Sequence, residues 1–157
     1  MGPVALGKNI ALFTLYYAFD LPGFFGPEAH HGACLFDLNT KSSLHKFLPE
    51  QGNMENPNSM NRFLQCSDIS VALSENFALI GSPEDGTEKE MLNSTYRGRA
   101  YLFDINTKEL LREFIPRTNE VQAGFGQAVA LSGNIALIKG AGFFVYDINS
   151  GQRLRTL

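Results

Sequence analysis

The chain of 157 residues is long enough for one domain with a sizeable core. Its 44% hydrophobic and 18% charged residues exclude an intrinsically disordered chain. The formal net charge of −3 excludes a strongly basic surface, so we expect no nucleic-acid partner. No run reaches the roughly 18 consecutive apolar residues of a transmembrane helix, and we expect no membrane span.

The chain opens with a pattern that returns twice. Residues 4–13 read Val-Ala-Leu-Gly-Lys-Asn-Ile-Ala-Leu-Phe, and close copies stand at 71–80 and 129–138. Each copy contains two short apolar runs joined by residues such as Ser-Gly-Asn, which predicts a tight β-hairpin. The apolar run 10–19 belongs to this repeat and no clear cleavage site follows it, so no signal peptide is visible.

A second pattern follows each copy of the first. Apolar residues lead into Asp-x-Asn-Thr or Asp-x-Asn-Ser, and another apolar run comes after. Asp37, Asp104 and Asp147 recur at the same point of the three copies. We interpret them as turn residues, because one active site rarely needs three copies whereas every turn needs its own hydrogen-bond acceptor.

Each unit therefore predicts a four-stranded antiparallel meander, and the chain is predicted to be all-β. We place blade 1 at 4–48, blade 2 at 71–115 and blade 3 at 129–157, in one repeat array over 1–157. Because such small sheets must stack face to face, we expect a β-propeller-type array of three four-stranded antiparallel blades, an incomplete ring. Such an array would be the segment of a longer propeller or would close as a homo-oligomer.

The clearest repeat, residues 124–138, reads Gly-Phe-Gly-Gln-Ala-Val-Ala-Leu-Ser-Gly-Asn-Ile-Ala-Leu-Ile and resembles the FG-GAP family of propeller repeats in its bacterial form. Ile80-Gly81-Ser82-Pro83 resembles the GAP half of that repeat. The Phe-Gly pair is missing before Val71, where Ser67 and Asp68 stand. Integrin-type members carry a calcium loop between their first two strands, but the connection here is too short for six to eight oxygen ligands, so we carry no calcium over.

The resemblance implies a secreted or cell-surface protein that binds other molecules. Because the sequence shows no Walker loop, dinucleotide fingerprint or zinc signature, we expect a non-catalytic propeller segment, not an enzyme. Its macromolecular partner would be a protein or a surface glycan. The localisation stays open, because no export signal accompanies the resemblance.

The interaction surface is expected at the rim where the long connections lie. Connections in a meander alternate between two rims, and the long ones, 14–32, 49–70, 81–98 and 116–127, emerge on the same rim. Aromatic and arginine side chains often anchor interfaces. The candidate partner-binding residues on this rim are Phe24, Phe25, His30, His31, Arg62, Tyr96 and Arg97. Phe24 and Phe25 would alternatively pack beneath their own loop.

No catalytic, cofactor-binding or metal-ligating set is predicted. His30 and His31 lack a third ligand at a recognisable spacing, and we read them as a solvated loop pair. The acidic stretch 84–90 lacks the Asp-x-Asp-x-Asp-Gly pattern of a calcium loop. Pairing of Cys34 with Cys66 and glycosylation at Asn93 both stay open.

Two alternatives remain. Residues 147–154, Asp-Ile-Asn-Ser-Gly-Gln-Arg-Leu, resemble an element of quinoprotein-like propeller enzymes, although the docking tryptophan of such blades is missing. An intracellular WD-type scaffold is the other alternative, but the repeat spacing is uneven and no Trp-Asp pair occurs.

Overall fold

The computed structural model describes residues 3–19, 28–47, 69–83, 97–117 and 124–157, and for 16–19 and 28–31 it describes the backbone alone. The strands of this part form three four-stranded antiparallel sheets, each paired in sequence order. This confirms the predicted all-β fold with three propeller-type blades. No helix of the described residues has the length and apolar character that a membrane crossing requires.

The three sheets follow one another along the chain. Blade I contains β1 (Val4–Leu6), β2 (Ile10–Phe19), β3 (Glu28–Asp37) and β4 (Ser42–Phe47). Blade II contains β5 (Ser70–Leu73), β6 (Phe77–Ser82), β7 (Arg99–Asp104) and β8 (Leu110–Phe114). Blade III contains β9 (Ala128–Ser132), β10 (Ile135–Lys139), β11 (Phe143–Asp147) and β12 (Arg153–Thr156).

Blade I differs from the expected layout at its second connection. The sequence suggests a long loop over 14–32, but β2 and β3 stay paired out to Phe19 and Glu28. His30 and His31 lie within β3, opposite Tyr17 and Tyr16, and the expectation of a histidine pair on a loop is wrong. Tyr16 and Tyr17 have strong β propensity and extend the ladder beyond the repeat unit.

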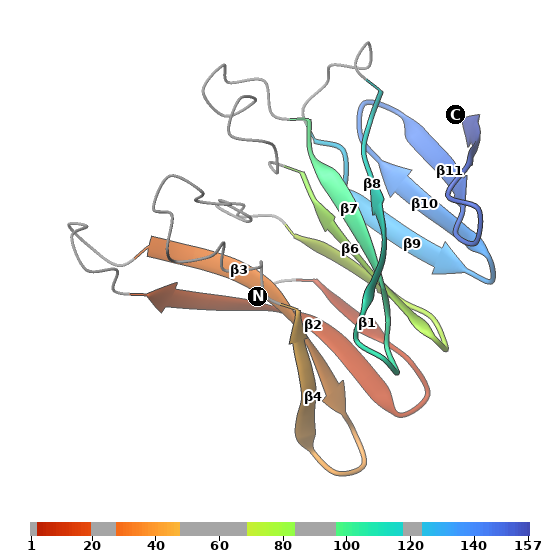
Figure 1. Cartoon of the computed structure of the whole chain (residues 1–157). Coiled ribbons are helices and arrows are strands. Elements are labelled where there is room, and N and C mark those ends of the chain that lie inside the picture. The colour runs from red at the N-terminus through yellow and green to blue at the C-terminus, as the bar shows by residue number, and fades with distance from the viewer. Residues whose placement is uncertain (1–2, 20–27, 48–68, 84–96, 118–123) are drawn as a thin grey trace.

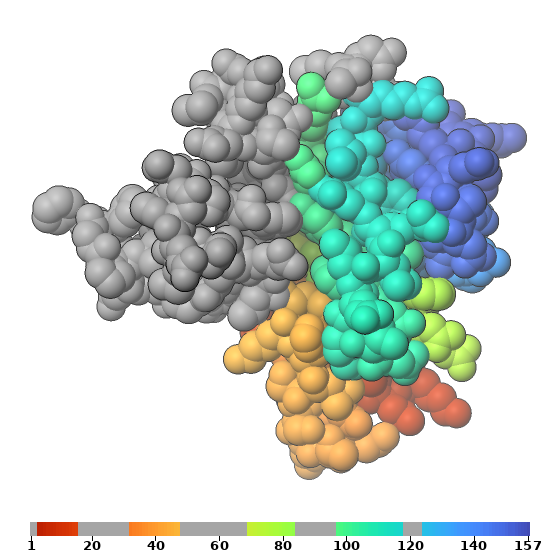
Figure 2. All heavy atoms as spheres, in the orientation of Figure 1, coloured from red at the N-terminus to blue at the C-terminus, as the bar shows by residue number. Residues whose placement is uncertain are grey.

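The blades lie side by side with blade II in the middle (Figure 1). Strand β5 contacts β1 and β2 on one side and β9 on the other, so the first strands of the blades are neighbours. In the space-filling view, β8 of blade II lies between β4 of blade I and blade III (Figure 2). One buried cluster fills the space between blades I and II, and a second fills the space between blades II and III.

The short connections between strands three and four share one backbone solution. Each turn contains a residue in the left-handed region, Lys41 at φ 55°, Lys108 at φ 68° and Gly151 at φ 73°. These three residues stand four positions after the repeated aspartates. Glycine adopts this conformation without the steric cost that a lysine pays, so the third turn is the least strained.

Candidate interaction surfaces

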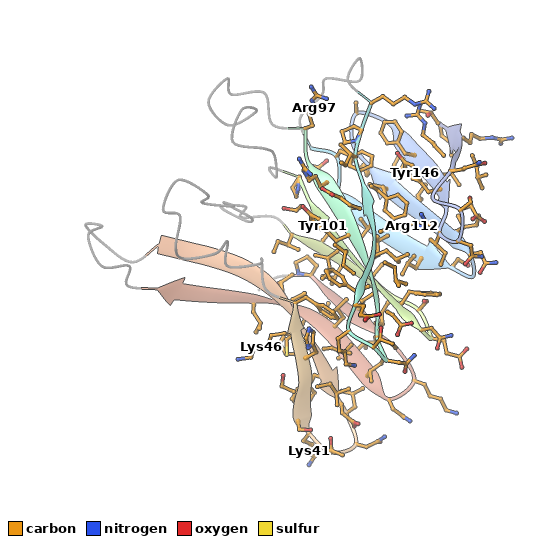
Figure 3. The ribbon with its side chains drawn as sticks, viewed as in Figure 1. Lys41, Lys46, Arg97, Tyr101, Arg112 and Tyr146 are labelled. Atoms are coloured by element: carbon orange, nitrogen blue, oxygen red, sulfur yellow. The ribbon has the colours of Figure 1, made fainter. Side chains whose placement is uncertain are left out.

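The two rims of the array carry different kinds of connection. The short hairpin turns and the Asp turns lie on one rim, which we call the turn rim. The connections 20–27, 48–69, 83–98 and 115–127 leave from the opposite ends of the strands, which we call the loop rim. Figure 3 shows Arg97 at the loop rim and Lys41 at the turn rim. The second connection of blade III, 140–142, is the short exception on the loop rim.

The predicted partner-binding residues divide into two groups. Phe24, Phe25, Arg62 and Tyr96 lie outside the described residues. Arg97 lies in the described part, one residue before the bridge that joins Gly98 to Phe125, and the backbones of His30 and His31 lie in β3 near the loop rim. The structure thus places Arg97 at the predicted rim and leaves the grouping of the set as a prediction.

Arg97 lies at a backbone contact between blade II and the entry to blade III. Its backbone carbonyl accepts a hydrogen bond of 3.2 Å from the amide of Phe125, the residue that leads into blade III. Its side chain is half-buried. The start of β7 and the entry to blade III are therefore joined by backbone contacts at the point where the long connections leave.

Phe125 and Gly126 pack between blades II and III. The Phe125 ring is buried, with its centroid 5.4 Å from that of Phe144 and 6.4 Å from that of Tyr146. The Gly126 amide donates to the carbonyl of Lys139 at 2.8 Å. Gly126 has φ +93°, and a Cβ there would lie 2.3 Å from the carbonyl oxygen of Arg99, so only glycine fits.

The same kind of ring contact closes both blade-to-blade interfaces. Phe47 of blade I meets Phe103 of blade II with centroids 4.6 Å apart, and Phe114 of blade II meets Tyr146 of blade III at 4.8 Å. Phe47 and Phe114 hold equivalent places, because each is opposite an alanine of the third strand of its blade. Phe47 is opposite Ala33 of β3, and Phe114 is opposite Ala100 of β7. The two interfaces are thus two copies of one packing scheme.

Arg112 adds hydrogen bonds to the interface between blades II and III. Its Nε donates to the carbonyl of Ile148 at 2.7 Å, and its Nη2 donates to the carbonyl of Asn149. It reaches from β8 to blade III, where Tyr146 also lies (Figure 3). Its guanidinium also lies over Gly151, where a Cβ would approach Nη1 to 2.7 Å. Arg112 is not among the residues predicted from the sequence, although Arg155 at the equivalent position of the third repeat was a signal for it.

The outermost faces of blades I and III carry apolar side chains that no described residue covers. Val4, Leu6 and Leu38 are exposed at the blade I end, and Phe143 and Leu157 are exposed at the blade III end. Isolated exposed apolar residues are ordinary, but here they stand at repeat positions that are buried or half-buried where blades pack on one another. These two faces are a second candidate interaction surface.

The repeated aspartates serve the turns, as the sequence predicts. Asp37 Oδ1 accepts hydrogen bonds from the amides of Asn39 and Thr40 at 2.7 and 3.0 Å, and Asp104 does the same with Asn106 and Thr107. Asp147 accepts from the amide and the hydroxyl of Ser150 at 2.7 and 2.8 Å. The backbone hydrogen bonds from Thr40, Thr107 and Ser150 contribute most to lowering the pKa values of the three carboxyls.

Other polar groups of the described residues are also engaged locally. The pKa of His45 lies below its ordinary value because of burial first and the Lys108 charge second. Cys34 is a free, buried thiol whose sulfur lies 3.3 Å from the Ser43 hydroxyl. Within the described ranges, no three His, Cys, Asp or Glu side chains come together as metal ligands would.

Comparison with known proteins shows a likeness to solved structures. The sequence matches no protein-family model and no curated protein. Among solved structures, the chain is similar to a europium-containing methanol dehydrogenase, with 15% identity and a TM-score of 0.48 over 94% of this chain and 24% of that one. The chain therefore spans about a quarter of that solved chain.

This comparison corrects one expectation from the sequence. The chain was expected not to be an enzyme, yet the structure that it resembles is that of an enzyme. We therefore withdraw the expectation of a non-catalytic chain. A likeness at this identity concerns the fold, and folds of this kind host many functions, so it assigns no activity to this chain.

Proposed function

We propose that this chain supplies three blades of a β-propeller that recognises a macromolecular partner at its loop rim. The observation that supports the proposal is the segregation of the connections: long ones leave from one rim and tight turns close the other. Long connections on a rigid scaffold commonly carry binding or catalytic residues.

The turn rim is a poorer candidate because its polar groups are already used. The Asp37, Asp104 and Asp147 carboxylates accept hydrogen bonds from their own turns, which leaves fewer acceptors for a ligand. The loop rim is fixed instead by the bridge between Gly98 and Phe125. This bridge joins the ends of two neighbouring connections by their backbones, and such pre-organisation lowers the entropic cost of binding.

The partner that we propose is a protein or a surface glycan. Tyr96 and Arg97 precede the Gly98 bridge directly, and tyrosine and arginine are enriched at interfaces because they offer large contact area with a polar end. Kinship with FG-GAP repeats also remains our proposal, and the wedge formed by Phe125 and Gly126 supports it.

Photo-crosslinking in the producing cell tests the choice of rim. Benzoylphenylalanine placed at Tyr96 should form crosslinks to one partner, identified by mass spectrometry. The matched control carries the same probe at Glu109, which is exposed on the turn rim of the same blade. Crosslinks to the same partner with equal yield from both positions, or from Glu109 alone, would contradict the proposal.

A propeller enzyme is the second candidate function. It is supported by residues 147–154, which resemble an element of quinoprotein-like blades and form a hydrogen-bonded turn here. Thermal melting with quinone cofactors and divalent ions would test it. A large rise in Tm with one cofactor would favour the enzyme, whereas unchanged melting would leave recognition at the loop rim as the better account.

A further inference from the structure

Each blade has two faces that can be compared position by position. We call the face toward the preceding blade in the chain the trailing face, and the face toward the following blade the leading face. The leading face of blade I packs on the trailing face of blade II, and the leading face of blade II packs on the trailing face of blade III. No described residue covers the two remaining faces, the trailing face of blade I and the leading face of blade III.

The turn residue after the repeated aspartate shows what the trailing face of blade I lacks. Ile105 of blade II and Ile148 of blade III are 7% and 3% exposed, because the preceding blade covers them. Leu38 holds the same place in blade I and is 45% exposed. The Leu38 amide donates a hydrogen bond to the carbonyl of Asn9. The amides of Ile105 and Ile148 donate in the same way to the carbonyls of Asn76 and Asn134. The local structure is therefore equivalent, and the difference is that a preceding blade covers Ile105 and Ile148.

The first strand repeats this contrast. Val71 of β5 is 9% exposed beneath blade I, whereas Val4, its equivalent in β1, is 61% exposed. Val4 is opposite Phe13, as Val71 is opposite Ile80. The trailing face of blade I thus carries the side-chain chemistry of a covered blade face.

The leading face of blade III shows the complementary gap. Phe47 and Phe114 end the last strands of blades I and II, are 5% and 3% exposed, and contact aromatic rings of the next blade. Leu157 exchanges backbone hydrogen bonds with Phe143 at the corresponding place and is 67% exposed. On a following blade, Leu157 would meet the aromatic residue that corresponds to Phe103 of blade II and Tyr146 of blade III. In blade I this residue is Phe36.

The arginines of the fourth strands also correspond between blades II and III. Arg112 is opposite Leu102 in β7 and donates to the carbonyls of Ile148 and Asn149 on the next blade. Arg155 is opposite Val145 at the matching register of blade III. The matching carbonyls on a trailing face that is still uncovered are those of Leu38 and Asn39.

We propose that the two uncovered faces bind a second copy of this chain, with blade III of each copy packed on blade I of the other. In such a ring the two contacts are identical by two-fold symmetry, and each of the two faces that the described residues leave uncovered is covered once. A closed ring of two copies contains six blades, within the roughly 4–8 that propellers use. The proposal continues the packing scheme of the two interfaces within the chain and does not rest on recognition at the loop rim.

Sedimentation velocity across a dilution series of the full chain tests the proposal. We expect a discrete species of twice the 17.3 kDa chain mass. Leu38→Asp and Leu157→Asp each place a charge in the proposed contact and should weaken dimerisation at least tenfold. Arg155→Glu tests the same contact without touching an apolar position. Leu111→Asp, on an exposed residue of the central blade, is the matched control and should dimerise as the wild type does.

Mixing distinguishes this head-to-tail contact from a face-to-itself dimer. Leu38→Asp retains an intact blade III face and Leu157→Asp retains an intact blade I face, so the mixture can form one intact contact. We expect mixed pairs, joined by the intact contact with the doubly charged contact left open, to form at concentrations where each variant alone is monomeric. Circular dichroism and urea midpoints of each variant check that the chains are folded.

Three outcomes would overturn the proposal. The first is a monomeric wild type at high concentration, which would indicate that another chain or further blades cover the faces. The second is a dimer that none of the face variants weakens, and the third is open polymers instead of a dimer. None of them bears on recognition at the loop rim, which the crosslinking experiment tests separately.

Discussion

The Ser70 hydroxyl at the start of β5 donates a 2.8 Å hydrogen bond to the carbonyl oxygen of Gly126, at the entry to blade III. Both residues are buried, and they are far apart in the sequence. This bond ties the innermost strand of blade II to the segment that leads into the next blade. Water cannot easily replace it, so its loss should affect stability directly.

Ser70→Ala should lower the free energy of unfolding by about 1–3 kcal/mol, because the substitution leaves a buried carbonyl without this donor. Urea denaturation followed by circular dichroism measures the change. Ser132→Ala, at an exposed position of β9, is the control and should change stability by less than about 0.5 kcal/mol. Equal effects of the two substitutions would argue against a tie between the blades.

Gly126→Ala should be far more destabilising than Gly124→Ala. Both glycines have positive φ, +93° and +100°, so the backbone strain of an alanine is similar at the two positions. A Cβ at Gly126 would lie 2.3 Å from the Arg99 carbonyl oxygen, whereas a Cβ at Gly124 meets nothing within 4 Å. We expect a loss of about 3 kcal/mol at Gly126 and about 1 kcal/mol at Gly124 in urea melts. Similar losses at both would mean that blades II and III are not in close contact here.

Lys41→Gly should stabilise the chain. Lys41 holds the left-handed conformation, φ 55°, that glycine holds in the third turn at Gly151. Relief of the Cβ strain of about 1–2 kcal/mol is partly offset by the greater freedom of glycine in the unfolded state. The net gain should be about 0.5–1 kcal/mol in urea melts. Lys41→Ala is the control, because it removes the same charge and keeps the strain.

The stability of the fold should fall as the pH drops below about 4, partly because the turn aspartates become protonated. Hydrogen bonds from Thr107 and Asn106 hold the pKa of Asp104 below its ordinary value in the folded state. The unfolded chain therefore binds the proton first, and the contribution of Asp104, present above its unfolded pKa, is lost as the pH falls through its folded pKa. Asp104→Asn should lower the urea midpoint at pH 6 and make the decline between pH 6 and 3 shallower.

Asp104→Glu is the control for this pH dependence. It retains the charge but moves the carboxylate away from the amides of Asn106 and Thr107. If the hydrogen bonds cause the dependence, the glutamate variant should show the same shallow decline as Asp104→Asn. A wild-type decline in the glutamate variant would instead attribute the effect to general charge.

The sequence predicted the parts of the fold that local chemistry determines. The hairpins and Asp turns follow from residues within a few positions of one another, as the hydrogen bonds of Asp37 to Asn39 and Thr40 illustrate. The ladder over 16–19 and 28–31 was missed, because the adjacent histidines carry no strand signal and their pairing with the tyrosines becomes visible only in the register. Of the candidate site, only Arg97 and the backbones of His30 and His31 lie in the described residues, so its grouping stays a prediction.

The contacts between blades could not be predicted from one repeat at a time. Ser70 reads as an ordinary strand serine, and Arg112 as a solvated residue of an outer strand. Their partners, Gly126 and the carbonyl of Ile148, lie in the following repeat, and only the stacking of the blades brings them near. Alignment of the fourth strands, which places His45, Arg112 and Arg155 at one register, was the available signal.

Arg112 should stabilise the packing of blade III on blade II through its two fixed hydrogen-bond donors, and not only through its charge. Its Nε and Nη2 donate to two successive carbonyls, those of Ile148 and Asn149, and a lysine can present no such pair of fixed donors. Arg112→Lys should therefore lose most of the stabilisation that Arg112→Ala loses, about 1–2 kcal/mol for a half-buried pair of hydrogen bonds. Amide hydrogen exchange should rise at Ile148 and Gly151 in both variants while it stays unchanged in β2 of blade I. Full retention of stability in the lysine variant would show that charge alone holds the interface, and unchanged exchange in the alanine variant would show that the ring contact between Phe114 and Tyr146 suffices.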